Sequence, residues 1–260
     1  MTIRSKIRAG IERVLLTQGF TITRAGADYL GAAPAIAAAK AKGQSVREYI
    51  EELWEQVGAA ERVANEFASA GALAHCQRVL EVGPGTGMFL EFILKRVQPQ
   101  QYDIYETAAD WAAYLAREYA PQVKRQSADG VSLKHTPDAS CGLVHGHGVY
   151  VYIKPLASFE YFAEMMRVCA PGGFIAFDFF AAEKFDVTQV THWLTFPDRY
   201  PIVMPAETVK AFFTQRGFRL VHQFDHKLGR GKSQYVVFKH GGWEVRDKSQ
   251  EPRTKIKSKE

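Results

Sequence analysis

Residues 79–87 read Val-Leu-Glu-Val-Gly-Pro-Gly-Thr-Gly, and this stretch decides the fold. An apolar, strand-like run meets three glycines at alternate positions, and an apolar, helix-forming run follows over 88–94. This order lets the backbone approach a ligand closely, because glycine has no Cβ and tolerates positive φ. The helix that follows aims its unpaired N–H groups at the same place. The stretch therefore predicts a ligand site at the end of a buried strand.

The glycine spacing narrows the class of ligand. A dinucleotide loop, G-x-G-x-x-G, would place its third glycine at position 88, but residue 88 is Met and the third glycine is Gly87. Pro84 also removes a backbone donor from the loop. The pattern E-x-G-x-G-x-G, which runs from Glu81 to Gly87, resembles the first motif of class I S-adenosylmethionine (SAM) dependent methyltransferases. A glycine-rich turn without a ligand is the alternative.

Strands and helices alternate after the loop, which predicts a parallel sheet with helices on both faces. The expected strands are 78–83, 101–106, 122–127, 141–146, 174–179, 218–224 and 234–239, and the helices are 45–57, 59–74, 86–97, 107–119, 156–169 and 206–216. The last two strands are too close for a helical crossover and should be antiparallel. The Pro-Gly-Gly turn at 171–173 also resembles the family. The fold class expected is α/β, a doubly wound, Rossmann-like sheet of seven strands, mostly parallel with an antiparallel last strand, plus extra N-terminal helices.

The resemblance also implies where SAM binds. Glu106 ends the second strand and matches the family's second motif, which holds the ribose hydroxyls; a surface acid that starts a helix is the alternative. Asp129 follows the third strand, where the family contacts adenine, although a simple Asp-Gly turn would read the same. SAM is the implied cofactor, and the residues implied to bind it are Glu81, Gly83, Pro84, Gly85, Thr86, Gly87, Glu106, Thr107, Ala128, Asp129 and His145.

Two histidines end the fourth strand, in the run Val-His-Gly-His-Gly at 144–148. Ligands of open α/β sheets lie beyond the carboxyl ends of the strands, so both are expected at the mouth of the site. Histidine, with a reference pKa of about 6.5, suits the general base for methyl transfer to a hydroxyl, although a histidine on a strand is often structural. His147 is the first candidate; His145 is a second that could instead brace the methionine carboxylate; Asp178 is a third. No carboxylates cluster nearby in the sequence, so no metal is expected.

Residues 181–205 form an insertion after the fifth strand that is expected to bind the acceptor. Aromatic and polar groups together suit a sugar or polyketide-like ring. The expected substrate-binding residues are His192, Trp193, Arg199 and Tyr200, although Trp193 could simply anchor a loop. The helix that carries Tyr49 and Trp54 is expected to form the other wall. The expected domains are an N-terminal helical cap (1–74), a SAM-binding domain (75–240) and a basic, disordered tail (241–260).

Composition limits the location and the partners. The chain is 47% hydrophobic and 23% charged, and no apolar run is long enough for a transmembrane helix. Three scattered cysteines and a charged N-terminus indicate a cytoplasmic protein rather than a secreted one. The net charge of +5 is concentrated over 239–260, where seven Lys or Arg stand against four acids. No nucleic-acid partner is therefore expected.

Residues 1–16 read as a basic amphipathic helix. Such a helix can lie on an anionic membrane or pack on its own domain or a subunit partner, so peripheral membrane contact and a homodimer both stay open. The function expected is a SAM-dependent methyltransferase, a transferase acting on a small-molecule or glycan acceptor at oxygen, with a histidine base. Methylation at nitrogen or carbon, a non-catalytic SAM-binding protein and a membrane-associated protein are the alternatives.

Overall fold

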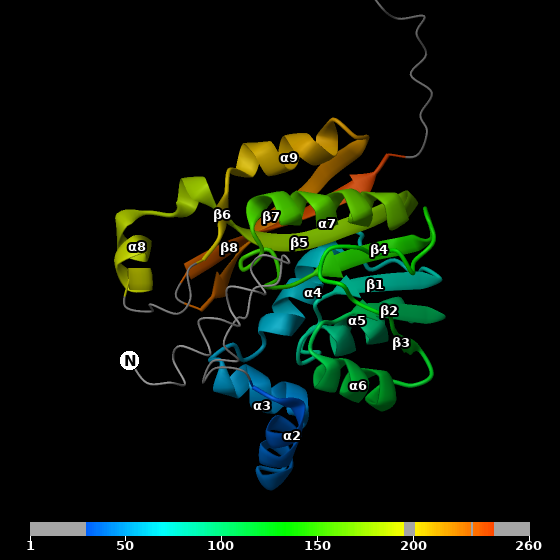
Figure 1. The fold of residues 1–260 in the computed structure, drawn as a ribbon, viewed down its shortest axis with the longest axis vertical. Helices are drawn as coiled ribbons and strands as arrows, with labels where there is room; N and C mark the ends of the chain where they lie inside the picture. Colours follow the sequence, from blue (N-terminus) through cyan, green and yellow to red (C-terminus); the bar gives the residue numbers. More distant parts are fainter. Residues whose placement is uncertain (1–29, 195–200, 230, 242–260) are drawn as a thin grey trace, which may run out of the picture.

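A computed structural model describes residues 30–194, 201–229 and 231–241 of the 260-residue chain (Figure 1). Its strands are β1 (Arg78–Val82), β2 (Gln101–Tyr105), β3 (Val123–Arg125), β4 (Cys141–Gly146), β5 (Cys169–Ala181), β6 (Val203–Met204), β7 (Phe218–Leu228) and β8 (Gly231–His240). They form one eight-stranded sheet in the order β3-β2-β1-β4-β5-β8-β7, with β6 paired to β5 off this path.

The strand directions confirm the expected topology. The pairs β1–β2, β1–β4, β2–β3 and β4–β5 are parallel, and β8 runs antiparallel to both of its neighbours. The strand order reverses between β1 and β4, where the helical connections lead to opposite sides. In a doubly wound sheet this switch point, at the carboxyl ends of the strands, is where ligands bind.

Helices cover both faces of the sheet (Figure 1). They are α2 (Ala32–Ala41), α3 (Val46–Leu53), α4 (Ala59–Ser69), α5 (Leu90–Val97), α6 (Ala109–Glu118), α7 (Pro155–Val168), α8 (Val187–Leu194) and α9 (Ala206–Thr214), with a 3-10 turn η1 (Ala182–Lys184). One core cluster joins α4, α5 and α6 to the sheet, and a second joins α7 and α9 to the other face. Because side chains alternate along a strand, Val79 belongs to the first cluster and Leu80 to the second.

Several boundaries differ from the expected ones for local reasons. The helix expected from residue 86 begins at Leu90, because Gly87 has a φ of 78°, which a right-handed helix does not accommodate. The helix expected to reach 74 ends at Ser69, shortly before Gly71 with a φ of 76°. The strands β7 and β8 extend further than expected, so only residues 229–230 separate them.

The N-terminal helices are fixed by specific contacts. Ser45 and Glu48 form the expected capping box at the start of α3. The backbone N–H of Ala32 in α2 donates to Asp110 at 2.8 Å, and Phe67 of α4 lies fully buried in the first core cluster.

None of the helices within the described ranges is long and apolar enough to cross a membrane. The helix expected over 1–16 and the tail expected over 241–260 lie outside those ranges, apart from residue 241.

Candidate active site

A cavity of about 390 Å³ opens at the carboxyl ends of β1 and β4. The loop after β1 lines it with Gly83 and Gly85, and the loop after β4 lines it with His147. Trp54 closes it from the N-terminal helices, as expected, and Tyr235 of β8 closes it from the hairpin. The cavity therefore lies at the switch point of the sheet and is formed by segments from both ends of the chain.

The glycine loop is shaped for close approach to a ligand. Gly83, Gly85 and Gly87 all have positive φ, at 60°, 53° and 78°. A Cβ on Gly83 would stand 2.7 Å from Val149, and one on Gly87 would stand 2.4 Å from Leu115, so packing requires both glycines. A Cβ on Gly85 would meet nothing within 4 Å. Gly85 therefore exposes bare backbone to the cavity, which is the geometry that a closely bound ligand requires.

Glu106, which directly follows β2, fixes this loop. One oxygen of its carboxylate accepts the backbone N–H of Gly85 at 2.7 Å, and the other accepts that of Ala108 at 2.7 Å. Asp129 lies after β3 and accepts hydrogen bonds from Val131 and Ser132, which hold the pKa of its carboxyl well below the usual range. The side chain of Asp129 thus closes the Asp-Gly turn that the sequence analysis gave as the alternative to adenine contact. The same side chain is 35% exposed.

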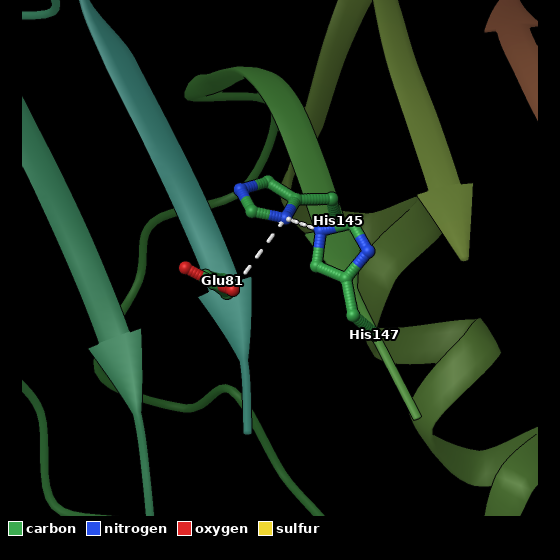
Figure 2. A group of neighbouring side chains, drawn as sticks. All are labelled: Glu81, His145 and His147. Atoms are coloured by element: carbon green, nitrogen blue, oxygen red, sulfur yellow. Dashed lines mark hydrogen bonds and ion pairs between the residues drawn. The ribbon is translucent and has the colours of Figure 1, made fainter. Parts of the chain in front are cut away.

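The two histidines belong to a buried chain of hydrogen bonds. Figure 2 shows the ring of His145 of β4 between Glu81 of β1 and His147, with one of its nitrogens facing both. The hydroxyl of Tyr102 donates to Glu81 at 2.7 Å and contacts Nε2 of His145 at 2.8 Å. Nδ1 of His145 lies 3.0 Å from Nε2 of His147, and Nδ1 of His147 lies 2.9 Å from the hydroxyl of Tyr235. The chain runs across the sheet from β2 to β8 and reaches the cavity at His147 and Tyr235.

Burial controls the charge of these groups. It lowers the pKa of His145 to about 3 and moves the pKa of His147 well below its ordinary value. It raises the pKa of Glu81 to about 8. The ring of His147 is stacked on Phe89, with centroids 3.9 Å apart, and lies 5.7 Å from the ring of Phe67. Both imidazoles are therefore neutral at physiological pH and are held in one orientation.

Comparison with known proteins identifies the family. A family model described as a methyltransferase domain matches residues 36–223, which is more than half of the chain. The chain belongs to this methyltransferase family. The match confirms the resemblance seen in the glycine loop and establishes a SAM-dependent methyltransferase. None of the curated proteins matches the chain.

Solved structures share the fold at low identity. An O-methyltransferase family protein from Burkholderia thailandensis is 13% identical with a TM-score of 0.58, and the match covers 76% of this chain and 60% of that chain. Magnesium protoporphyrin IX methyltransferase from Synechocystis, solved with bound SAH, is 11% identical with a TM-score of 0.58, over 72% and 85% of the two chains. A SAM-dependent methyltransferase from Aquifex aeolicus is 16% identical with a TM-score of 0.52, over 75% and 98%.

Replacing Glu106 with alanine is expected to weaken binding of S-adenosylhomocysteine (SAH) to the methyltransferase. The change removes the acceptor that holds the N–H of Gly85, a residue that lines the cavity. Hydrogen bonds to a charged group contribute about 1.5–3 kcal/mol each, so an affinity loss of about 10-fold or more should be measured by calorimetry. Glu118→Ala, at an exposed acid of α6, is the matched control. Equal affinity in the two variants would contradict a role for Glu106.

Asp178 braces the loop that carries the second histidine. Its side chain is fully buried, and Oδ1 accepts the backbone N–H of Gly148 at 2.7 Å. Burial raises the pKa of Asp178 to about 6, partly opposed by that hydrogen bond. Asp178 does not itself line the cavity, but it holds the backbone of Gly148, which does, one residue beyond His147.

The raised pKa makes a stability prediction for Asp178→Asn. The pKa of this carboxyl is higher in the folded protein than in the unfolded chain. Its contribution to the free energy of unfolding is therefore fully present below the unfolded-state pKa and is lost as pH rises through about 6. Asparagine keeps the oxygen for Gly148 but carries no charge. The variant should gain up to about 3 kcal/mol relative to wild type between about pH 4 and pH 8. Urea unfolding at both pH values measures this, and a pH-independent difference would contradict the burial of an ionisable Asp178.

Trp193 lies beside the β7–β8 hairpin rather than free in the insertion. Its ring centroid is 5.8 Å from that of Phe180, and its atoms lie within 3.5–3.7 Å of positions that a Cβ on Gly231 or Gly229 would take. Gly229 lines the cavity, so Trp193 stands behind that wall. Arg199 and Tyr200 lie outside the described residues, as does the side chain of His192.

Sequence reasoning missed the two tyrosines of the chain of hydrogen bonds. Tyr102 and Tyr235 lie on strands whose apolar pattern alone explains a buried aromatic residue. Their hydroxyl partners depend on the strand order, which sequence patterns leave open. Gln56 and His226 also line the cavity. Neither residue belongs to a sequence motif, so the sequence offered no reason to select them.

Proposed function

We propose that this methyltransferase transfers the methyl group of SAM to an oxygen atom of a small-molecule or glycan acceptor bound in the cavity at His147. The observation that carries the proposal is the placement of a neutral, oriented imidazole in the wall that also contains Gly85. Trp54 and Tyr152 give that wall aromatic surface, and His226 gives it a polar group, which together suit a ring that carries hydroxyls.

The residues of the glycine loop, with Thr86, fit the cofactor because Gly85 leaves open space where a side chain would stand. We assign the ribose to Glu106 and the adenine end to Asp129, Ala128 and Thr107, following the family motifs. Bound SAM supplies a methyl group already activated on a sulfonium. The protein would therefore contribute mainly orientation, by holding the acceptor oxygen against the methyl group of the cofactor.

His147 would receive the acceptor's proton, by way of Tyr235. Both nitrogens of His147 are hydrogen-bonded, and Nδ1 contacts the hydroxyl of Tyr235 at 2.9 Å. With SAM bound, the acceptor proton would pass to the Tyr235 oxygen and the Tyr235 proton to Nδ1 of His147, as the acceptor oxygen takes the methyl group and the carbon–sulfur bond breaks. The positive charge would thereby move from the sulfonium of SAM to the imidazole of His147. The net charge of the buried site would stay the same. Asp178 keeps the loop of His147 in place.

Methyl-labelled SAM tests the proposal with panels of hydroxylated, amine and carbon-acid acceptors. Transfer of label to a hydroxyl, giving an ether that is stable to base, is the expected result. Label found only on amines or carbon would show a methyltransferase of another specificity on the same scaffold. SAH binding with no transfer to any panel would favour a SAM-binding protein without catalysis.

A further inference from the structure

Glu81 is an acidic group in the core of the methyltransferase. Its side chain is 1% exposed and shares the α4 face of the sheet with its register partner His145. A buried carboxylate is costly unless hydrogen-bond donors or a cation compensate it. The hydroxyl of Tyr102 donates a hydrogen bond to Oε2 of Glu81. Oε1 of Glu81 lies 3.9 Å from Nδ1 of His145.

The hydrogen bonds determine which nitrogen of His145 carries a proton. When Glu81 is ionised, as it must be to bind a cation, Tyr102 donates its one hydroxyl proton to Oε2 of Glu81. The 2.8 Å contact between Tyr102 and Nε2 of His145 must then be donated by the ring N–H. Nδ1 of the neutral ring is left with a lone pair directed toward Glu81 and His147. Two electron-pair donors therefore face one another across a gap that a cation would bridge.

We propose that Glu81, His145 and His147 bind one divalent transition-metal ion of the zinc class (Figure 2). One ligand atom of each residue lies within 4.8 Å of the others. Ligand atoms around tetrahedral zinc stand about 3.3 Å apart, for bonds of about 2.0–2.1 Å. The observed separations of 3.0 Å between the imidazoles and 3.9 Å from His145 to Glu81 lie on either side of that value. Carboxylate and imidazole are ordinary ligands of such ions.

The surroundings support this assignment. Metal-binding histidines usually hydrogen-bond through their second nitrogen, which fixes the ring. Here Nε2 of His145 contacts Tyr102, and Nδ1 of His147 contacts Tyr235. Each imidazole thus has one nitrogen held by a phenol and the other directed into the cluster. Phe89 stacks on the ring of His147 and limits its rotation.

The cluster adjoins the cavity at one point. His147 lines the cavity, so an ion bound to this side chain would lie beside the acceptor pocket. An ion there would polarise an acceptor oxygen, and His147 would act as a ligand rather than as the proton acceptor. This role for the ion rests on the proposed function, but the binding of the ion does not.

Cobalt titration tests the site directly. The full chain is stripped with a chelator, shown to be folded by circular dichroism, and titrated with Co²⁺, whose visible absorption reports its coordination; Zn²⁺ is then added as a competitor. One Co²⁺ per chain, displaced by Zn²⁺, is expected. Glu81→Gln, His145→Ala and His147→Ala should each lower the affinity by at least about 100-fold, because loss of a residue that only hydrogen-bonds to a metal ligand already costs about 10–100-fold. His222→Ala removes a partly exposed histidine paired with Glu66 and should leave it unchanged.

Thermal unfolding distinguishes a lost metal site from a variant that fails to fold. Zn²⁺ should raise the Tm of the wild type and of His222→Ala but not that of Glu81→Gln, which keeps the size of the native side chain. Absence of Co²⁺ binding in the folded wild type would overturn the inference, as would binding that survives both Glu81→Gln and His147→Ala. SAH binding is measured in the same samples: ion binding without SAH binding would refute the proposed function alone, and the reverse result would refute this inference alone.

Discussion

His147→Ala is expected to lower kcat for methyl transfer to a hydroxyl by about 10²–10⁴-fold, the usual contribution of a general base. The change removes the imidazole that lines the cavity and that, in the proposed function, takes the acceptor proton through Tyr235. SAH affinity should change little, because the glycine loop and Glu106 are untouched. Steady-state kinetics with the acceptor found in the panel, alongside SAH calorimetry, measures the two effects separately.

The same variant separates the alternatives. His222→Ala, which leaves the cavity intact, serves as the control for removal of a histidine. Full activity of His147→Ala would point to an acceptor nitrogen, which needs less help from a base. A chelator distinguishes the two roles of His147: loss of wild-type activity on chelation, restored by Zn²⁺, would indicate a ligand, and indifference to chelation would indicate a proton acceptor.

Gly85→Arg should abolish SAH binding, with an affinity loss of at least about 100-fold, or about 2.7 kcal/mol. A side chain at position 85 projects into open space at the cavity and would occupy the volume that the cofactor needs. Its φ of 53° adds backbone strain of about 1–2 kcal/mol without a steric clash, so the fold should persist.

Gly217→Arg is the matched control for that substitution. Gly217 has a φ of 84°, a Cβ there would meet nothing within 4 Å, and it lies between α9 and β7. Both variants should lose similar stability in urea unfolding, and only Gly85→Arg should lose SAH. Equal SAH affinity in the two variants would show that the cofactor does not approach the glycine loop.

Periodicity and turn chemistry were enough to predict the elements of the fold. The alternation of strands and helices and the close spacing of the last two strands predicted the sheet and its antiparallel member, which the structure confirms. Local backbone conformation was harder to predict: the positive φ of Gly87 delays α5, and the short strand β6 has no pattern that marks it.

Sequence patterns could not predict which side chains lie close together on neighbouring strands of the sheet. Glu81 and His145 are far apart in sequence, and only the β1–β4 register places them side by side. For this reason the sequence led to no expected metal, whereas the structure places a carboxylate beside both histidines. Tyr102 and Tyr235 join the same cluster from β2 and β8, and their roles depend on hydroxyl partners rather than on hydropathy.

Calorimetric titration of the folded protein, free of copurified cofactor, with SAH and with NADH tests the central claim most directly. We expect one site of micromolar affinity for SAH and no binding of NADH, because the third glycine of the loop comes one residue earlier than in the dinucleotide spacing. Absence of SAH binding, or binding of NADH at the same site, would contradict it.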